Sequence, residues 1–355
     1  MKQLKLNYLF IAALFATVLA SCHKDKLVNN QPTPTAQRAG VYVLDQGVNG
    51  PNSALTYYDY TTKVLTPDIF SAVNGRGLGN TANDAEIYGS KMYIVVDKSG
   101  TVEVINAKTA KSIKSVPFQN LDQTSEEPRD IAFYNGNAFV TMYNGNVAVM
   151  DTTTFAVSKN IPVGNDPEQL VVANGKLYVA NSGGLNYPDV DSTVSVINLA
   201  SLTVTKTINV GADPYAISTD GNGHVFVTAY GVYPTSNSTL TVIDDASDAV
   251  TSKTDFTGGP FAYNGSTAYY IDFDFSVKAY NTKTLTAGTT NFITDGTTFT
   301  AAFAIAADPL TGEVFVTDAI DYTSNGLLYA FDKTGKKEYS LTTGINPGNI
   351  IFVNK

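Results

Sequence analysis

Cysteine, histidine and tryptophan are almost missing from this chain of 355 residues. It contains one cysteine, Cys22, two histidines, His23 and His224, and no tryptophan. A single thiol excludes a disulfide within the chain, so burial alone must hold the fold together. With one histidine next to Cys22 and the other far along the chain, a multi-histidine metal centre is also excluded.

Positive charge is scarce as well. The 23 Lys and Arg residues face 32 Asp and Glu residues, which gives a formal net charge of −9. This balance argues against binding nucleic acid, which requires Lys and Arg to neutralise phosphates. It also argues against electrostatic adhesion to anionic lipid. No phosphate-binding loop, dinucleotide fingerprint or nucleophile motif occurs.

Long apolar runs are absent too, because the segment Leu9–Leu19 is well short of the ~20 residues of a membrane-spanning helix. It lies between Lys2 and Lys5 and the tetrapeptide Leu19–Cys22. This order is typical of a secretory signal peptide, and the tetrapeptide resembles a bacterial lipobox, whose cysteine is acylated. We therefore expect a signal peptide over residues 1–21, a lipidated Cys22 and a flexible tether over 22–39. The alternative is an ordinary secretory signal with an incidental cysteine.

From Gly40 onward the sequence repeats a unit of four short strands, which we call A to D. Each unit opens with an apolar segment, usually after a proline, followed by a tight turn, two alternating strands and a threonine-rich outer strand. The turn residues recur at intervals of 39 to 47 residues: Gly89, Gly136, Gly175, Asn222, Gly265 and Gly312. Gly and Asn supply the positive φ that such turns need. Four short strands at this period predict a β-propeller blade.

The two ends of the chain predict how the ring closes. The segments 41–44 and 55–58 match strands B and C, and nothing before them matches strand A. The segment 347–353 has the proline and the apolar run of a strand A, and then the chain stops. The C-terminal strand is therefore expected to complete the first blade, which removes free sheet edges. The prediction is an all-β, seven-bladed propeller of four-stranded antiparallel blades over residues 40–355.

The repeat has a family resemblance. The stretch 176–217 resembles the YVTN repeat of YncE-like seven-bladed propellers: KLYVANSGG…STVSVINLASLTVTKTINVGADPYAI. Further stretches resemble a group of Bacteroidota lipoproteins: 43–47, 73–81, 128–129 and 167–169. That group includes the BtuG-type proteins, which capture cobalamin for a TonB-dependent transporter. The resemblance implies an outer-membrane lipoprotein, not an enzyme, that captures a small ligand for such a partner at the cell surface, with a periplasmic orientation as the alternative.

Propeller geometry assigns the loops to two faces. The A–B turns are short and uniform, whereas the B–C loops on the other face are long and varied. Varied loops on a rigid scaffold are where binding normally occurs, and aromatic walls suit a small molecule. The candidate ligand-binding residues of this face are Tyr187, Tyr230, Tyr233, Phe273 and Tyr322.

Arg129 and Glu168 are candidates of a second kind. Each follows a proline at the start of an inner strand, so each can point into the central channel. Two roles stay open: the side chains pair with each other across neighbouring blades, or they offer a donor and an acceptor to a ligand. Asp84 and Asp213 are expected at related positions between blades.

Four aspartates form a possible Ca²⁺ site, because Ca²⁺ prefers clustered oxygen ligands. They are Asp272, Asp274, Asp318 and Asp321. The alternative is that these acids are scattered and solvated. Two further functions stay open beside ligand capture. One is an adhesion or scaffold module that uses the whole face, and the other is a metal-dependent lactonase or lyase.

Overall fold

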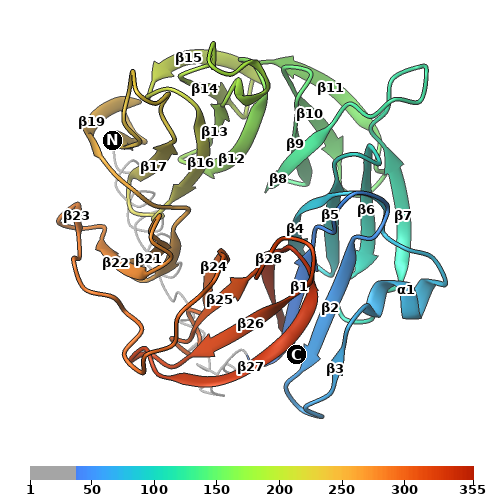
Figure 1. Cartoon of the computed structure of the whole chain (residues 1–355). Coiled ribbons are helices and arrows are strands. Elements are labelled where there is room, and N and C mark those ends of the chain that lie inside the picture. Colours follow the sequence, from blue (N-terminus) through green and yellow to red (C-terminus); the bar gives the residue numbers. More distant parts are fainter. Residues whose placement is uncertain (1–36) are drawn as a thin grey trace, which may run out of the picture. The chain divides into compact units, whose positions relative to one another are not determined.

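The computed structural model describes residues 37–355, which form seven four-stranded antiparallel sheets set around a common axis (Figure 1). This confirms the seven-bladed propeller predicted from the repeat. Blade one contains β28 (Pro347–Asn354), β1 (Arg38–Asp45), β2 (Ala54–Asp59) and β3 (Leu65–Thr66). The predictions for residues 1–36, including Cys22, lie outside the described residues.

The other six blades follow the chain in order, each from its inner to its outer strand. Blade two has β4 (Ala82–Tyr88), β5 (Lys91–Val96), β6 (Thr101–Asn106) and β7 (Ser112–Pro117). Blade three has β8 (Pro128–Tyr134), β9 (Asn137–Met142), β10 (Asn146–Asp151) and β11 (Val157–Pro162). Blade four has β12 (Pro167–Ala173), β13 (Lys176–Asn181), β14 (Thr193–Asn198) and β15 (Thr203–Asn209). Blade five has β16 (Pro214–Thr219), β17 (His224–Ala229), β18 (Thr239–Asp244) and β19 (Ala249–Asp255). Blade six has β20 (Ala262–Asn264), β21 (Thr267–Ile271), β22 (Val277–Asn281) and β23 (Thr286–Ala287). Blade seven has β24 (Ala302–Ala307), β25 (Val314–Asp318), β26 (Asn325–Phe331) and β27 (Lys337–Ile345).

The hydrophobic core lies between neighbouring blades. One cluster, for example, joins Tyr93 and Val104 of blade two to Ile131 and Val140 of blade three. In blades two to five the second and third strands are covered on both faces, which explains their almost continuous burial, whereas outer strands such as β11 are mostly exposed. Apolar side chains on both faces of a strand are stable only where a sheet packs on each side.

The ring closes through the two ends of the chain, as the sequence predicted. Strand β28 pairs antiparallel with β1, so that Val41 lies opposite Phe352 and Val43 opposite Ile350. Arg38, at the start of β1, donates from Nε and Nη2 to the carboxylate of Asp308 in blade seven, at 2.9 and 2.7 Å. This ion pair adds a side-chain link between the first and last blades.

Two short helices lie in loops between strands. Helix α1 (Ile69–Asn74) follows β3 and buries Phe70, and the sequence analysis did not predict it. Asp68 caps its first turn, and Gly75 ends it in the left-handed conformation. A 3₁₀ turn, η1 (Gly184–Asn186), lies in the loop between β13 and β14. Neither helix in the described part of the chain is long and apolar enough to cross a membrane.

Candidate functional site

A cavity of about 430 Å³ opens on the face that carries the B–C loops. Its lining comes from all seven blades, because each blade contributes residues at the start of its inner strand or, in blade six, Pro260 two residues before it. Gln46 and Tyr230 of two B–C loops complete the lining. The cavity therefore lies on the propeller axis, at one mouth of the central channel. The channel-mouth cavity is the candidate site.

β-Bulges at the start of the inner strands place the lining side chains. In β8, Pro128 pairs with Met142, but the next pair joins Ile131 to Val140, so one extra residue lies on the β8 side. The same shift occurs in β12 between Pro167 and Leu170. Strands β4, β16 and β24 also shift register near their starts. A bulge re-aims side chains away from the regular alternation of a strand, and here it turns polar groups toward the axis.

The bulges of blades three and four form a charged wall. Arg129 donates from Nε and Nη2 to the two carboxylate oxygens of Glu168, at 3.0 and 2.6 Å. Its Nη1 donates to Oδ2 of Asp97 at 2.7 Å, and its guanidinium lies 4.6 Å from the ring centre of Tyr143. The pairing role expected for Arg129 and Glu168 is therefore present. Both residues also line the cavity.

Two half-buried carboxyl groups continue this wall. The Ile131 N–H donates to both of them, to Oδ2 of Asp84 in β4 at 3.3 Å and to Oδ1 of Asp130 in β8 at 2.8 Å, so the two carboxyl groups are neighbours. Desolvation by the surrounding protein raises the pKa of both groups. The backbone N–H of Leu170 donates to Asp130 at 3.0 Å, and Asn349 Nδ2 donates to Asp84 at 2.5 Å. Because ionising one of two adjacent carboxyl groups disfavours ionisation of the other, the pair loses its protons in two separate steps.

The sequence analysis missed this carboxyl pair. Asp84 was grouped with Asp213, but it occupies the same position in β4 as Asp130 does in β8, whereas Asp213 directly precedes β16. The signal was the shared pattern of a polar residue followed by aspartate in consecutive units, Asn83-Asp84 and Arg129-Asp130.

Blades five to seven supply an aromatic wall. Tyr215 at the start of β16 and Tyr230 in the next B–C loop stack at 3.7 Å between ring centres, with 12° between their planes. Phe273 lies 6.3 Å from Tyr230, and Tyr322 lies 6.0 Å from Phe303. Tyr215 was not predicted, although Pro214-Tyr215 repeats the pattern of Pro128-Arg129.

The five aromatic candidates from the sequence share this face. Among residues 37–355 they are the aromatic side chains classed as exposed, from 46% for Tyr322 to 88% for Tyr233. Tyr187 O–H donates to the Tyr233 carbonyl at 3.4 Å, which connects the loops of blades four and five. We call Tyr187, Tyr230, Tyr233, Phe273 and Tyr322 the aromatic rim.

The division into a polar side and an apolar side also appears at the third residue of each inner strand or, in blade six, two residues after Pro260. Blades one to four carry polar side chains at this position, and blades five to seven carry alanine. The polar residues are Asn349, Asp84, Asp130 and Gln169, and the alanines are Ala216, Ala262 and Ala304. Gln169 Oε1 accepts from the Ile217 N–H at 3.2 Å, so even the polar side is held by interblade hydrogen bonds. The channel wall is thus polar on one side and apolar on the other.

The four aspartates proposed to bind Ca²⁺ serve local structure instead. Asp318 accepts hydrogen bonds from the backbone N–H groups of Thr300 and Ala301, and Asp272 forms an ion pair with Lys278. Asp274 and Asp321 each accept hydrogen bonds from residues two or three positions further on. Residues 37–355 contain no group of three or more His, Cys, Asp or Glu side chains that could hold a metal ion. The structure therefore does not form the expected calcium cluster.

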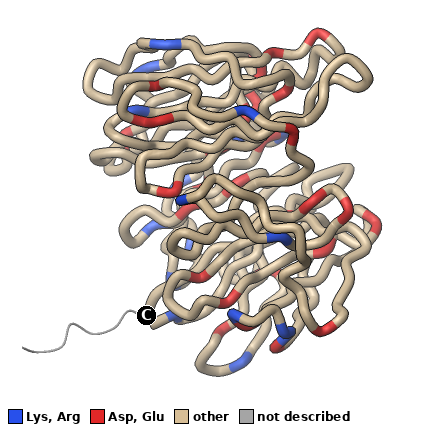
Figure 2. The backbone as a smooth tube through the Cα atoms, turned by 90° about the vertical axis from the view of Figure 1, so that its left-hand side faces the viewer, with Lys and Arg blue, Asp and Glu red and all other residues tan. Residues whose placement is uncertain are grey.

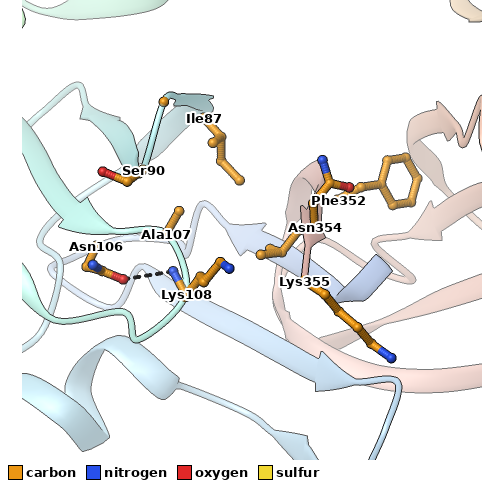
Figure 3. Close-up of a pocket in the computed structure, with 10 residues that line it drawn as sticks. Ile87, Ser90, Asn106, Ala107, Lys108, Phe352, Asn354 and Lys355 are labelled. Atoms are coloured by element: carbon orange, nitrogen blue, oxygen red, sulfur yellow. Dashed lines mark hydrogen bonds between the residues drawn. The ribbon is translucent and has the colours of Figure 1, made fainter. Parts of the chain in front are cut away.

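A second cavity, of about 300 Å³, lies on the opposite face between blades one and two (Figure 3). The labelled side chains of Ile87, Ala107 and Phe352 are apolar, and the one hydrogen bond drawn, from Lys108 N to Asn106 Oδ1 at 3.0 Å, belongs to a turn. Its lining contains two lysines, Lys108 and Lys355, and one aromatic residue, Phe352, but no acidic side chain and no stacked aromatic pair like those of the channel mouth.

The blades and the polarised mouth define an all-β, seven-bladed propeller with a ligand-sized cavity on its axis. Residues 39–346 match the family model described as a domain of unknown function, DUF5074, and the chain belongs to this family. No curated protein matches the chain.

Three solved structures are similar to this chain in fold. A quinonprotein alcohol dehydrogenase-like protein from Bacteroides thetaiotaomicron has a TM-score of 0.63 and 17% identity, covering 89% of this chain and 78% of that one. Hydrazine synthase from Kuenenia stuttgartiensis has a TM-score of 0.53 and 16% identity, covering 68% and 73%. The computationally designed Ika8 protein has a TM-score of 0.57 and 14% identity, covering 90% and 98%. Likenesses at these identities concern the fold alone.

Proposed function

We propose that this chain is a lipid-anchored binding protein of the cell envelope that captures a small ligand at the channel mouth for a TonB-dependent outer-membrane transporter. The observation that carries the proposal is the channel-mouth cavity, with its charged wall, its aromatic wall and the aromatic rim around it. The lipobox at Cys22 supports the anchor. The resemblance to YncE-like lipoproteins and BtuG-type proteins supports the surface location and the transporter partner.

The groups at the channel mouth are better suited to binding than to catalysis. No Ser, Thr, Cys, Lys or His side chain is among the residues that line the cavity. Nucleophilic catalysis by these side chains needs one of them beside a base. The guanidinium of Arg129 is already held by two carboxylates. A concave aromatic surface also favours a small ligand over an adhesion partner, which would use a flat face.

Cobalamin is the first ligand to test, because the resemblance points to it. A cavity of about 430 Å³ is too small to enclose the whole cobalamin molecule. In this proposal the corrin ring lies across the mouth, against the aromatic rim. This arrangement would make the rim, more than the channel floor, the determinant of affinity.

The test replaces two rim residues, Tyr187→Ala with Tyr233→Ala, in the full-length lipoprotein in detergent. Stacking contributes about 0.5–1.5 kcal/mol for each ring beyond buried area, and ~1.4 kcal/mol is a tenfold change in Kd. Calorimetry should therefore show cobalamin binding weakened at least tenfold. The thermal midpoint should barely change, since surface substitutions usually alter stability by about 0.5 kcal/mol or less.

Leu310→Ala is the matched control, because Leu310 is also exposed but lies in an A–B turn on the opposite face. It should leave cobalamin affinity unchanged. Unchanged affinity in the double variant together with a loss in the control would place binding on the opposite face and overturn the assignment.

A further inference from the structure

The channel mouth keeps an excess of negative charge after its arginine is paired. Arg129 is the one basic residue among those that line the cavity. Its guanidinium already donates to Glu168 and Asp97 through three N–H groups. The Asp84–Asp130 pair adds further negative charge on the same side. A cleft lined by one sign of charge concentrates ligands of the opposite sign.

Two further carboxylates have oxygen atoms to spare. Asp97 is buried beside the guanidinium, and its Oδ1 has no hydrogen-bond partner among the described residues. Asp213 is half-buried just before β16, and its carboxylate has no hydrogen bond within residues 37–355. Carboxylate oxygens therefore outnumber the protein donors around this wall, so an incoming anion would find no free cationic partner.

An aromatic face lies next to these carboxylates. Tyr230 stacks on Tyr215 on one side and stays about half exposed. The Tyr230 N–H donates to the backbone carbonyl of Asp213 at 2.9 Å, so Asp213 lies directly beside Tyr230, and Glu168 and Tyr230 both line the cavity. A cation over a tyrosine ring is attracted by the negative charge of the ring face, and the attraction is stronger where water is excluded.

We propose that the channel mouth selects organic cations, with an ammonium or guanidinium group held between Asp213, Glu168 and the ring of Tyr230 and an apolar part on the aromatic rim. This inference rests on the proposed capture function and names a ligand class other than cobalamin for the same site, since cobalamin carries no ammonium or guanidinium group. Anions are rejected because the guanidinium that could bind them is occupied by Glu168 and Asp97.

The experiment uses three probes with the same phenol ring and different end groups: tyramine, which is a cation, tyrosol, which is neutral, and 4-hydroxyphenylacetate, which is an anion. Each probe is titrated into the full-length protein in detergent and followed by saturation-transfer NMR and calorimetry. Tyramine should bind at least tenfold more tightly than tyrosol, and the anion should bind most weakly. The tyramine affinity should fall with added salt, because charge attraction is screened.

Asp213→Asn should remove most of the preference for tyramine while leaving tyrosol affinity unchanged. Asp332→Asn is the matched control, since it removes the same charge from a C–D turn on the opposite face. It should leave the preference intact. A folded Asp213→Asn variant that keeps the full preference would overturn the role of this carboxylate.

Equal affinity for the three probes, tighter binding of the anion, or binding of none of them would overturn the inference. The proposed function is decided separately. If the probes bind equally and lose affinity in Tyr230→Leu, the capture site stands and its charge selection does not. If the rim variants leave cobalamin and every probe unaffected, the capture site itself is wrong.

Discussion

At the scale of single residues, burial governs the chemistry of the carboxyl groups. Asp45 at the end of β1 is fully buried, and Thr56 Oγ1 donates to its Oδ2 at 2.8 Å. Its Oδ1 has no partner among the described residues. Burial raises the pKa of Asp45 to about 8, from an ordinary value of 3.8. The folded state therefore keeps a proton that the unfolded chain releases near pH 4, and this group makes stability fall as pH rises toward 8.

We expect Asp45→Asn to flatten that dependence. Asparagine is neutral at every pH, so its advantage over the wild type should grow by up to about 1.4 kcal/mol per pH unit between pH 5 and 8. Urea unfolding at pH 5.5 and 7.5 measures the difference. Asp59→Asn, in an exposed turn of the same blade, is the control and should not show this growth. Parallel pH dependences for Asp45→Asn and wild type would contradict the prediction.

Cys22 carries the second prediction at this scale. The lipobox predicts acylation of its thiol, so cells grown with a fatty-acid probe should label the wild-type protein. Cys22→Ser should lose the label and leave the membrane fraction, because the net negative charge of the chain gives no electrostatic attraction to anionic lipid. Equal labelling of both proteins would rule out the anchor.

At the scale of strands, the turn residues made the positions of the strands predictable, whereas the register between paired strands could not be predicted. Asn-Gly pairs such as Asn135-Gly136 have φ of 47° and 80° in the structure, as the turn signal required. Proline marked most inner strands, which is why Arg129 and Glu168 could be chosen from the sequence. The bulges could not be foreseen, because an extra residue in one strand is visible only against its partner. This is why the contact between Asp84 and Asp130 was not predicted, although the repeated patterns that contain Asp84, Asp130 and Tyr215 are visible in the sequence.

Strand β28 supports a prediction about ring closure. Deleting residues 347–355 would expose the edge of β1 and apolar inner-strand surface, and it would remove the Asn354 partner of Arg38. We expect loss of cooperative thermal unfolding and binding of a hydrophobic dye.

Arg38→Ala is the milder form of this experiment. It leaves the Asp308 carboxylate buried without its cation, which costs about 3 kcal/mol for such pairs. The variant should fold with a lowered midpoint. A truncated protein that melts cooperatively at the wild-type temperature would show that closure does not depend on β28.

At the scale of the whole molecule, acidic groups with raised pKa values and acidic groups with lowered pKa values together set the pH range of stability. Figure 2 shows acidic residues (red) and basic residues (blue) along the backbone of the blades. Burial and the charge of Glu168 raise the pKa of Asp213 to about 6. Glu86 is solvent-accessible, yet enclosure by the surrounding protein and the Asp84 charge raise its pKa to about 8. Exposed turn acids behave in the other way: hydrogen bonds from Lys337 and Thr297 lower the pKa of Asp295 to about 2.

These directions predict a stability maximum near pH 5. Groups with raised pKa values favour folding at low pH, and their contribution is lost as pH rises through about 6 to 8. Groups with lowered pKa values favour folding above pH 4, and their contribution to stability is lost as pH falls toward 2. Thermal unfolding followed by circular dichroism between pH 3 and 9 should show midpoints that decrease on both sides. A midpoint that keeps rising from pH 5 to 8 would contradict this balance.

The bulges at the mouth also bear on how such proteins diversify. The bulged residues, such as Asn83, Arg129, Glu168 and Tyr215, lie outside the regular strand ladder that maintains each blade. Point mutations there can change charge or shape without disturbing the hydrogen bonds between strands. Each blade supplies about one such position, so different combinations of side chains can be presented at the channel mouth on the same backbone. Relatives with the same architecture can therefore acquire different ligands through few genetic steps.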